Sequence, residues 1–391
     1  MVDLDVLRAT DGSLIDTPRR WAERRLELLR LFQEEMYGPW PGAAEELTAA
    51  VVSEDPAALD GTATLQDILI GTVRPDCVFH LLMLTPHAAA TPVACFLGAN
   101  SGGNHTVLAN TRIVLLDCLI YPTRASRGEP ASPADRGRQA DSWDVRATID
   151  AGYAFATFCC GEVVPDSATA ARQTLRGFSV DGRDTAAVMT WAWALARALD
   201  VVGNHESIDP SRVIAVGHSR LGKAALVAGA FDPRFAAVIA SQSGCGGAAP
   251  SRIGPELAVI TANGRPTAET PAVITSTFPH WFSPRWREHA ADVDKLPFDQ
   301  HHLLALCAPR PLLLANATDD AWTDPDGQFE MLQAAEPAYR LLRGDQTGTL
   351  ERPRVDEISA GPLAYALRAG RHSMIAADWP VWRDFADRWV R

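Results

Sequence analysis

A serine stands where the backbone is expected to turn sharply. Residues 217–223 read GHSRLGK around Ser219, with an apolar run at 213–216 before them and an alanine-rich run at 224–230 after them. This pattern predicts a strand, a tight turn and a helix, with the Ser219 hydroxyl exposed beside the first free N–H groups of the helix. Because those N–H groups can bind the oxyanion that forms when a serine attacks an ester, the segment is typical of a nucleophilic serine.

The segment resembles the nucleophile elbow of the α/β-hydrolases, with one departure. In the usual pattern a second glycine follows the serine after one intervening residue. Here Leu221 holds that place and the glycine comes one residue later, at Gly222. The resemblance implies that the serine lies at the carboxyl end of a strand in a mostly parallel sheet.

A nucleophilic serine needs a general base and a group that orients the base. In α/β-hydrolases the order along the chain is serine, acid, histidine, so the histidine should lie near the C-terminus. Of the ten histidines in the sequence, only His372 follows position 302. It lies in a turn-like segment at 369–373, before a predicted helix at 379–389. We therefore expect His372 to be the base.

Three aspartates compete for the place of the acid, because all three follow a buried run at 312–315. Asp324 precedes a proline and is predicted to cap the helix that begins there. Asp319 and Asp320 both fit the expected geometry, and their spacing does not separate them. Since adjacent carboxylates repel each other, we expect one to face the histidine and the other to face solvent.

The composition and charge argue against several classes of protein. The 391 residues carry a formal net charge of −12, which would repel nucleic acid and anionic membranes. No stretch approaches the 18 or so consecutive apolar residues of a membrane-spanning helix. Residues 1–5 show no secretory signal, and the seven cysteines form no CxxC pair and lie mostly in apolar runs. These features predict a cytoplasmic protein, with removal of a leader as the alternative.

Short apolar runs alternate with helical patterns along the chain. Helices are predicted at 19–36 and 184–200, and an antiparallel hairpin at 63–73 and 77–84. Runs typical of strands buried on both faces lie at 93–97, 113–119, 153–158, 213–216, 236–240 and 311–315.

This alternation predicts an α/β-hydrolase fold, a three-layer sandwich around a mostly parallel sheet. We expect a single domain over residues 1–391, with the N-terminal helix and hairpin as an extension. The loops at 120–142 and 244–300 are long and rich in proline, glycine and arginine, which is typical of a lid or a substrate wall.

Further segments resemble the glucuronoyl esterases, carbohydrate esterase family 15. The stretch at 217–223 is similar to that family's signature, Gly-Cys/His-Ser-Arg-x-Gly-Lys, and the resemblance extends over roughly residues 20–390. It is greatest for the bacterial branch. The other similar segments are MYG at 36–38, FLG at 96–98, GNH at 103–105, WAW at 191–193, SGCGGAA at 243–249, FPHWF at 278–282, LPFDQH at 296–301 and DAWTDP at 320–325.

The resemblance implies a role for four residues of the site. The family's nucleophile falls on Ser219, its base on His372 and its strand-end acid on Asp320, which separates Asp320 from its neighbour by resemblance alone. Its arginine falls on Arg220, whose guanidinium and N–H are both expected to point at the developing oxyanion.

One position departs from the family. Many members carry a glutamate or an aspartate just before the Ser-Gly of the segment 243–249, whereas this chain has Gln242, which does not ionise. The family's activity would therefore depend on Asp320 in this chain.

The resemblance also implies three contacts with a sugar, at Lys223, Trp322 and Glu269, while a further polar contact of the family is replaced at Thr277. Lys223 lies one helical turn after Ser219, so that it either reaches the substrate or is a solvated helix lysine. For Trp322, simple loop packing is the alternative.

By resemblance, the chain is expected to be a serine ester hydrolase that cleaves esters of glucuronic acid or a related sugar acid through an acyl-enzyme. Its substrate would be a small-molecule or oligosaccharide ester, and no metal or cofactor is expected. The pair at 301–302 (HH) is a weak metal candidate because adjacent histidines point apart. Two alternatives are an esterase or acyl-transfer enzyme that acts on a non-uronate ester in metabolism, and a non-catalytic carbohydrate-binding relative.

Overall fold

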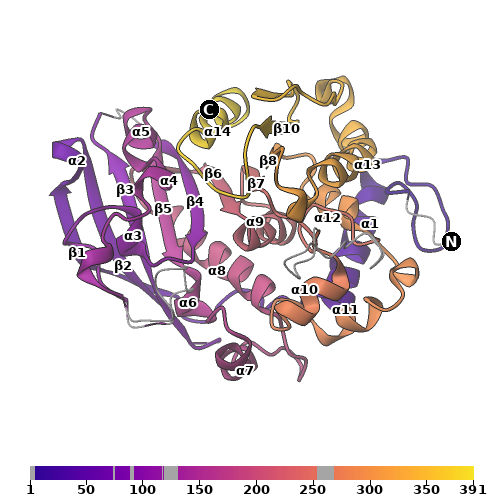
Figure 1. Ribbon diagram of the computed structural model, residues 1–391, viewed down its shortest axis with the longest axis horizontal. Helices are drawn as coiled ribbons and strands as arrows, with labels where there is room; N and C mark the ends of the chain where they lie inside the picture. The colour runs from indigo at the N-terminus through magenta and orange to yellow at the C-terminus, as the bar shows by residue number, and fades with distance from the viewer. Residues whose placement is uncertain (1–4, 74, 89–91, 117, 119–130, 253–267) are drawn as a thin grey trace.

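The described residues form one mixed sheet of ten strands, in the order β1-β2-β3-β5-β4-β6-β7-β8-β10-β9 (Figure 1). The computed structural model describes residues 5–73, 75–88, 92–116, 118, 131–252 and 268–391. The strands are β1 Thr48–Ala57, β2 Ala63–Thr72, β3 Cys77–Pro86, β4 Val93–Asn100, β5 Ala154–Cys159, β6 Ile208–His218, β7 Ala237–Ser241, β8 Leu312–Ala317, β9 Glu357–Ile358 and β10 Leu363–Arg368.

Helices flank this sheet and fill the connections between its strands (Figure 1). They are α1 Pro18–Phe32, α2 Ala58–Gly61, α3 Asn104–Val107, α4 Ala140–Trp143, α5 Val145–Asp150, α6 Cys160–Val163, α7 Ala168–Arg176, α8 Ala187–Val202, α9 Arg220–Phe231, α10 Pro271–Thr277, α11 Pro284–His289, α12 Gln300–Ala305, α13 Pro325–Arg343 and α14 Asp378–Trp389.

The centre of the sheet is parallel. Strands β5, β4, β6, β7, β8 and β10 run in one direction, whereas β1, β2 and β3 at one end and β9 at the other pair antiparallel. Strands β5, β7 and β8 are buried along their whole length. Strands covered on both faces need apolar side chains at successive positions, which explains their continuous apolar runs.

The sheet separates two hydrophobic cores, one on each face. One core includes side chains of α1, α8, α9, α12 and α13, and the other includes those of α5 and α14. Helix α8 is buried over nearly all of its length. Its Trp191 and Trp193 place their indole N–H groups 3.0 and 2.8 Å from the carbonyl oxygens of Val164 and Gly42. The apolar character of this helix on most sides therefore reflects coverage by other segments as well as by the sheet.

Most of the predicted elements are present. The hairpin at 63–73 and 77–84 corresponds to β2 and β3, and the helix at 19–36 corresponds to α1 followed by a π-helical turn at Gln33–Tyr37. The strand predicted at 113–119 is wrong, because residues 113–116 and 118, which the structure describes, lie in no strand. There the Val114 N–H donates to the buried side-chain carboxylate of Asp67 on β2 at 2.8 Å, which is a side-chain contact and forms no strand pairing.

The two long loops are only partly described. Residues 119–130 and 253–267 lie outside the described residues, but the segment 244–300 also contains α10 and α11 and is less irregular than its composition suggests. The prediction of a single domain over 1–391 stays a prediction. None of the helices in the described ranges combines the length and apolar character needed to cross a bilayer.

Candidate active site

The turn between β6 and α9 places Ser219 in a conformation that few residues adopt. Its φ is +57°, and its N–H donates to the carbonyl of Ser241 on the next strand at 2.8 Å. A Cβ at Gly217 would overlap the carbonyl oxygen of Leu221, and one at Gly222 would lie 3.0 Å from the Ser241 oxygen. Leu221, by contrast, is buried in the core beneath the turn. The displaced glycine of the sequence is therefore explained by the close approach of α9 to β7 at position 222.

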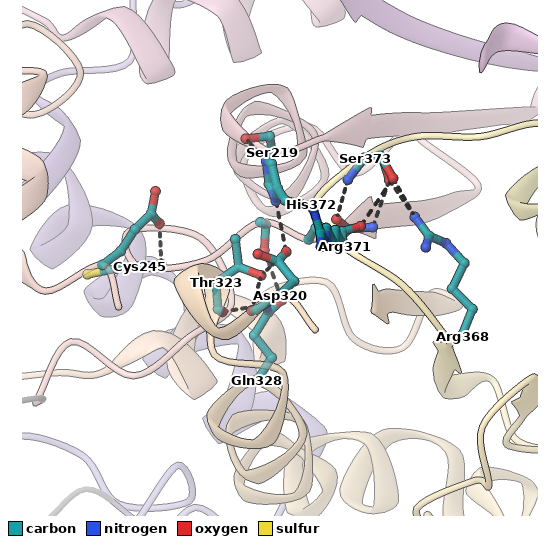
Figure 2. A network of polar contacts seen from close by, with 12 residues as sticks. Ser219, Cys245, Asp320, Thr323, Gln328, Arg368, Arg371, His372 and Ser373 are labelled. Carbon is teal, nitrogen blue, oxygen red and sulfur yellow. Dashed lines mark hydrogen bonds and ion pairs between the residues drawn. The ribbon is translucent and has the colours of Figure 1, made fainter. Parts of the chain in front are cut away.

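Three side chains from distant parts of the sequence meet at this turn (Figure 2). His372 Nε2 lies 3.0 Å from Ser219 Oγ, and His372 Nδ1 lies 2.8 Å from Asp320 Oδ2. Asp320 is only 2% exposed, whereas Asp319 is exposed. The structure thus places Asp320, and not Asp319, against the imidazole. An imidazole held in this way can accept the proton of a serine hydroxyl and keep its charge beside a carboxylate.

The segment after β8 holds Asp320 in place. The Thr323 hydroxyl donates to Asp320 Oδ2, and the Thr323 N–H donates to the Asp320 carbonyl at 3.1 Å. Gln328 on α13 donates to the Thr323 carbonyl at 2.7 Å. Asp324 caps α13 by accepting the Gly327 N–H at 2.9 Å. Asp324 therefore has a structural task, as its place before a proline predicted.

Arg220, the first residue of α9, is held by a buried carboxylate that the sequence did not single out. Its guanidinium pairs with Asp166 and lies 4.7 Å from the ring centroid of Trp281. Asp166 also accepts from His280 at 2.9 Å and from the Trp281 indole at 2.7 Å. Burial by itself would raise the pKa of Asp166, but these donors and the Arg220 charge together lower it. Asp166 stays ionised and fixes a positive charge beside the serine.

Lys223 and Glu269 form a buried ion pair one helical turn from Ser219. Lys223 is 1% exposed and Glu269 is 5% exposed, with Nζ 3.1 Å from Oε2. Lys223 also donates to the Ser243 carbonyl, and Glu269 accepts the N–H of Cys245 at 3.0 Å. The alternative of a solvated Lys223 is therefore wrong, because the packing of 243–249 and Glu269 encloses its ammonium.

Trp322 lies beside this pair. Its carbonyl accepts the Glu269 N–H at 2.9 Å, and its side chain is partly exposed in the turn that follows Asp320. Thr277 lies exposed at the end of α10, where its hydroxyl donates to the Val273 carbonyl. The structure thus brings the expected sugar-binding residues Lys223, Glu269 and Trp322 together.

Known proteins resemble this chain along its length. A family model described as glucuronyl esterase, fungi, matches residues 131–343. The carbohydrate esterase MZ0003, from an unknown prokaryotic organism, is 35% identical over 98% of this chain and 88% of its own length. The chain belongs to the glucuronoyl esterase family.

Solved structures of this family share the fold. A promiscuous CE15 esterase from a marine bacterial metagenome is 34% identical, with a TM-score of 0.87 that covers 100% of this chain and 97% of that one. Glucuronoyl esterase from Solibacter usitatus is also 34% identical at a TM-score of 0.87, covering 99% and 98% of the two chains. The predicted resemblance and the α/β-hydrolase fold are both confirmed.

In this member of the glucuronoyl esterase family, a second histidine lies against the first. The ring of His218 has its centroid 4.8 Å from that of His372. Burial, and then the charge of His372, lower the pKa of His218 well below its usual range. His218 is therefore neutral near pH 7 and adds no positive charge against the imidazolium that His372 would form.

The other histidine pair has a structural explanation. The His302 side chain accepts the N–H of Asp299 at the start of α12, which completes a capping box. Across the described residues of this esterase, no group of three or more His, Cys, Asp or Glu side chains is arranged to hold a metal ion.

Proposed function

We propose that this chain is a serine esterase that cleaves esters of glucuronic acid, or of a closely related sugar acid, through an acyl-enzyme. The observation that carries the proposal is the hydrogen-bonded series Ser219–His372–Asp320 at the β6–α9 turn. This series supplies a nucleophile, a base and an orienting carboxylate in the geometry that acyl transfer requires.

In the proposed mechanism His372 Nε2 takes the proton of Ser219 as its oxygen attacks the ester carbonyl. Asp320 orients the imidazole and stabilises its positive charge. The N–H groups at the start of α9 and the guanidinium of Arg220 stabilise the oxyanion. The C–O bond to the alcohol breaks as the alcohol takes the proton from His372. His372 then accepts a proton from water as the water oxygen attacks the acyl carbon, and the bond to Ser219 breaks as the Ser219 oxygen takes that proton back and the acid is released.

The buried Lys223–Glu269 pair supports a sugar acid as the acyl half of the substrate. Both charges are almost fully buried, so they can bind hydroxyl groups, as donor and acceptor respectively, only where the segment that covers them moves. The partly exposed Trp322 can pack against an apolar ring face without such a change. Solibacter usitatus glucuronoyl esterase, which shares this chain's fold and about a third of its residues, is named for that substrate class.

The proposal is tested by incubating the protein with methyl and benzyl glucuronate and measuring alcohol release. We expect turnover by the wild-type chain and none by Ser219→Ala, which leaves the binding residues intact. A different result would be a folded wild-type chain that releases no alcohol from either uronate but hydrolyses simple acetyl or aryl esters. That result would indicate the alternative, an esterase or acyl-transfer enzyme that acts on a non-uronate ester in metabolism. Equal behaviour of Ser219→Ala and wild type in every assay would indicate a carbohydrate-binding protein without catalysis.

We also propose a cytoplasmic location, with a soluble uronate ester or oligosaccharide fragment as the substrate. All seven cysteines are free thiols, and six of them are buried. Reduced thiols in this number are typical of proteins that fold in a reducing compartment. Cell fractionation followed by immunodetection tests the location directly.

A further inference from the structure

Gln242 stands at the end of β7, next to the catalytic turn, in a conformation that is unusual for a residue with a side chain. Its φ is +48°, it is 1% exposed, and its N–H donates to the Ala315 carbonyl on β8 at 2.8 Å. Backbone strain of this kind persists only where the surrounding contacts impose it. The contacts of Gln242 with the neighbouring strand therefore impose its backbone conformation, and that conformation sets the direction of its side chain.

The carboxamide of Gln242 binds one peptide unit on each side of a single residue. Its Oε1 accepts the N–H of Ser373 at 2.9 Å, and its Nε2 donates to the carbonyl of Ser373 at 2.9 Å. Ser373 directly follows His372. The two hydrogen bonds hold the backbone beside the imidazole as a pair of cross-strand bonds would.

The same carbonyl is held from a second side. Arg368, at the end of β10, donates to the Ser373 carbonyl at 2.6 Å, and Figure 2 shows Arg368 and Ser373 in this arrangement. Arg368 is in turn paired with Asp378 at 2.6 Å. Ser373, the residue after His372, is thus bonded by Gln242 at the end of β7 and by Arg368 at the end of β10.

A carboxamide satisfies both contacts at position 242, because it has one donor and one acceptor group. An ionised carboxylate accepts but does not donate, so that a glutamate there would set an oxygen against the Ser373 carbonyl oxygen. We propose that Gln242 is a positioning residue that fixes the orientation of the His372 imidazole through the Ser373 backbone, and that it does not mark a lost acid. This inference rests on the proposed function, in which His372 is the base.

The two interpretations of Gln242 predict opposite results for Gln242→Glu. A lost acid would be restored by glutamate, which would raise kcat and rescue Asp320→Asn. A positioning residue would lose one of its two bonds, and a carboxylate oxygen would then face the Ser373 carbonyl oxygen. We expect kcat to fall about tenfold while KM stays within about twofold. We also expect Gln242→Glu to give no rescue of Asp320→Asn.

The variants to compare are Gln242→Glu, Gln242→Leu and Gln242→Asn, the last of which keeps the amide but shortens its reach. Gln346→Glu on an exposed turn is the matched control for the added charge. Each is measured for kcat and KM on methyl glucuronate, for the rate of fluorophosphonate labelling of Ser219, and for thermal unfolding. Labelling should slow in parallel with kcat in all three Gln242 variants and stay unchanged in the control.

The outcomes separate the two proposals. A wild-type chain that neither turns over nor is labelled contradicts the proposed function itself. An active wild type with unchanged kcat in the Gln242 variants, or a rescue of Asp320→Asn by Gln242→Glu, overturns the positioning role. Loss of the fold in all three variants would make Gln242 a purely structural residue, which also contradicts the inference.

Discussion

At the scale of single residues, the positive charge beside Ser219 depends on a carboxylate that never meets the substrate in our proposal. Asp166 accepts hydrogen bonds from three side chains, and one of them is the guanidinium of Arg220. The rings of Trp281 and Phe278 lie 4.7 and 5.4 Å from that guanidinium. A charge confined in this way loses little freedom when an oxyanion forms beside it.

Replacing Arg220 by alanine should therefore lower kcat by roughly 10²-fold, the usual effect of losing one oxyanion donor. Asp166→Asn should lower kcat by a smaller factor, on the order of tenfold, because it removes the charge that pairs with the guanidinium but leaves the guanidinium present. Steady-state kinetics on methyl glucuronate measure both. An Asp166→Asn enzyme as active as wild type would show that the guanidinium needs no anchor.

The Lys223–Glu269 pair makes a prediction about stability. Both groups are almost fully buried, so neutralising one partner leaves the other charge without compensation. We expect Glu269→Gln and Lys223→Met each to lower the free energy of unfolding by about 3–5 kcal/mol, and the double variant to lose less than either. Urea unfolding measures the three values. Costs that simply add in the double variant would contradict a coupled pair.

At the scale of elements, the β6–α9 unit depends on how closely the helix approaches the strand end. Gly217 has the backbone of Leu221 directly above it, and this leaves no room for a methyl group. The strained φ of Ser219 is tolerated because the Ser219 N–H bonds to β7 and the helix begins at the next residue.

We expect Gly217→Ala to destabilise the protein by more than about 3 kcal/mol or to displace α9, since backbone atoms have no way to yield. Gly177→Ala is the matched control, because Gly177 has a helical φ of −66° and its nearest contact lies at 3.2 Å. Thermal unfolding compares the two. Similar melting temperatures for both variants would show that the turn is more adaptable than its geometry indicates.

At the scale of the whole molecule, buried histidines couple stability to pH. Burial lowers the pKa of His218 and of His302 well below the usual range, and His301, Arg24 and Arg252 add to the effect at His302. The unfolded chain, with histidine pKa values of about 6.5, therefore binds protons that the folded chain does not accept. Stability is consequently retained above about pH 6.5 and falls as the pH drops below it.

For each such histidine, the free energy of unfolding should fall by about 1.4 kcal/mol per pH unit once the pH is below the pKa of the imidazole in the unfolded chain. His80 acts in the opposite sense, because its bond to Glu162 raises its pKa. Comparing His302→Gln with wild type isolates the contribution of one histidine. The free energy of unfolding of the variant should fall less than that of wild type between about pH 6.5 and about pH 5. Urea unfolding at a series of pH values measures both. Identical slopes would indicate that His302 is protonated in the folded protein.

Much of this fold could be predicted because its signals are local. A strand buried on both faces needs consecutive apolar residues, and a sharp turn before a helix needs glycines around the serine, so Ser219 and most of the parallel strands are visible in the sequence. Strand β1 was missed because its side chains are largely exposed and mostly polar or small. The strand predicted at 113–119 was wrong because an apolar run shows that a segment is buried, but not that it pairs with another strand.

Position in the sequence was enough to select the proposed nucleophile and base, since one serine had the elbow pattern and one histidine followed it late enough. Only the tertiary structure decided which aspartate meets His372, that Lys223 is enclosed, and that Asp166 and Gln242 belong to the site. These choices depend on contacts between residues far apart in the sequence, such as Asp166 with Arg220, 54 residues away, and Gln242 with Ser373, 131 residues away. Local patterns specify which elements form, but the packing of those elements determines which polar side chains are buried together and must satisfy one another.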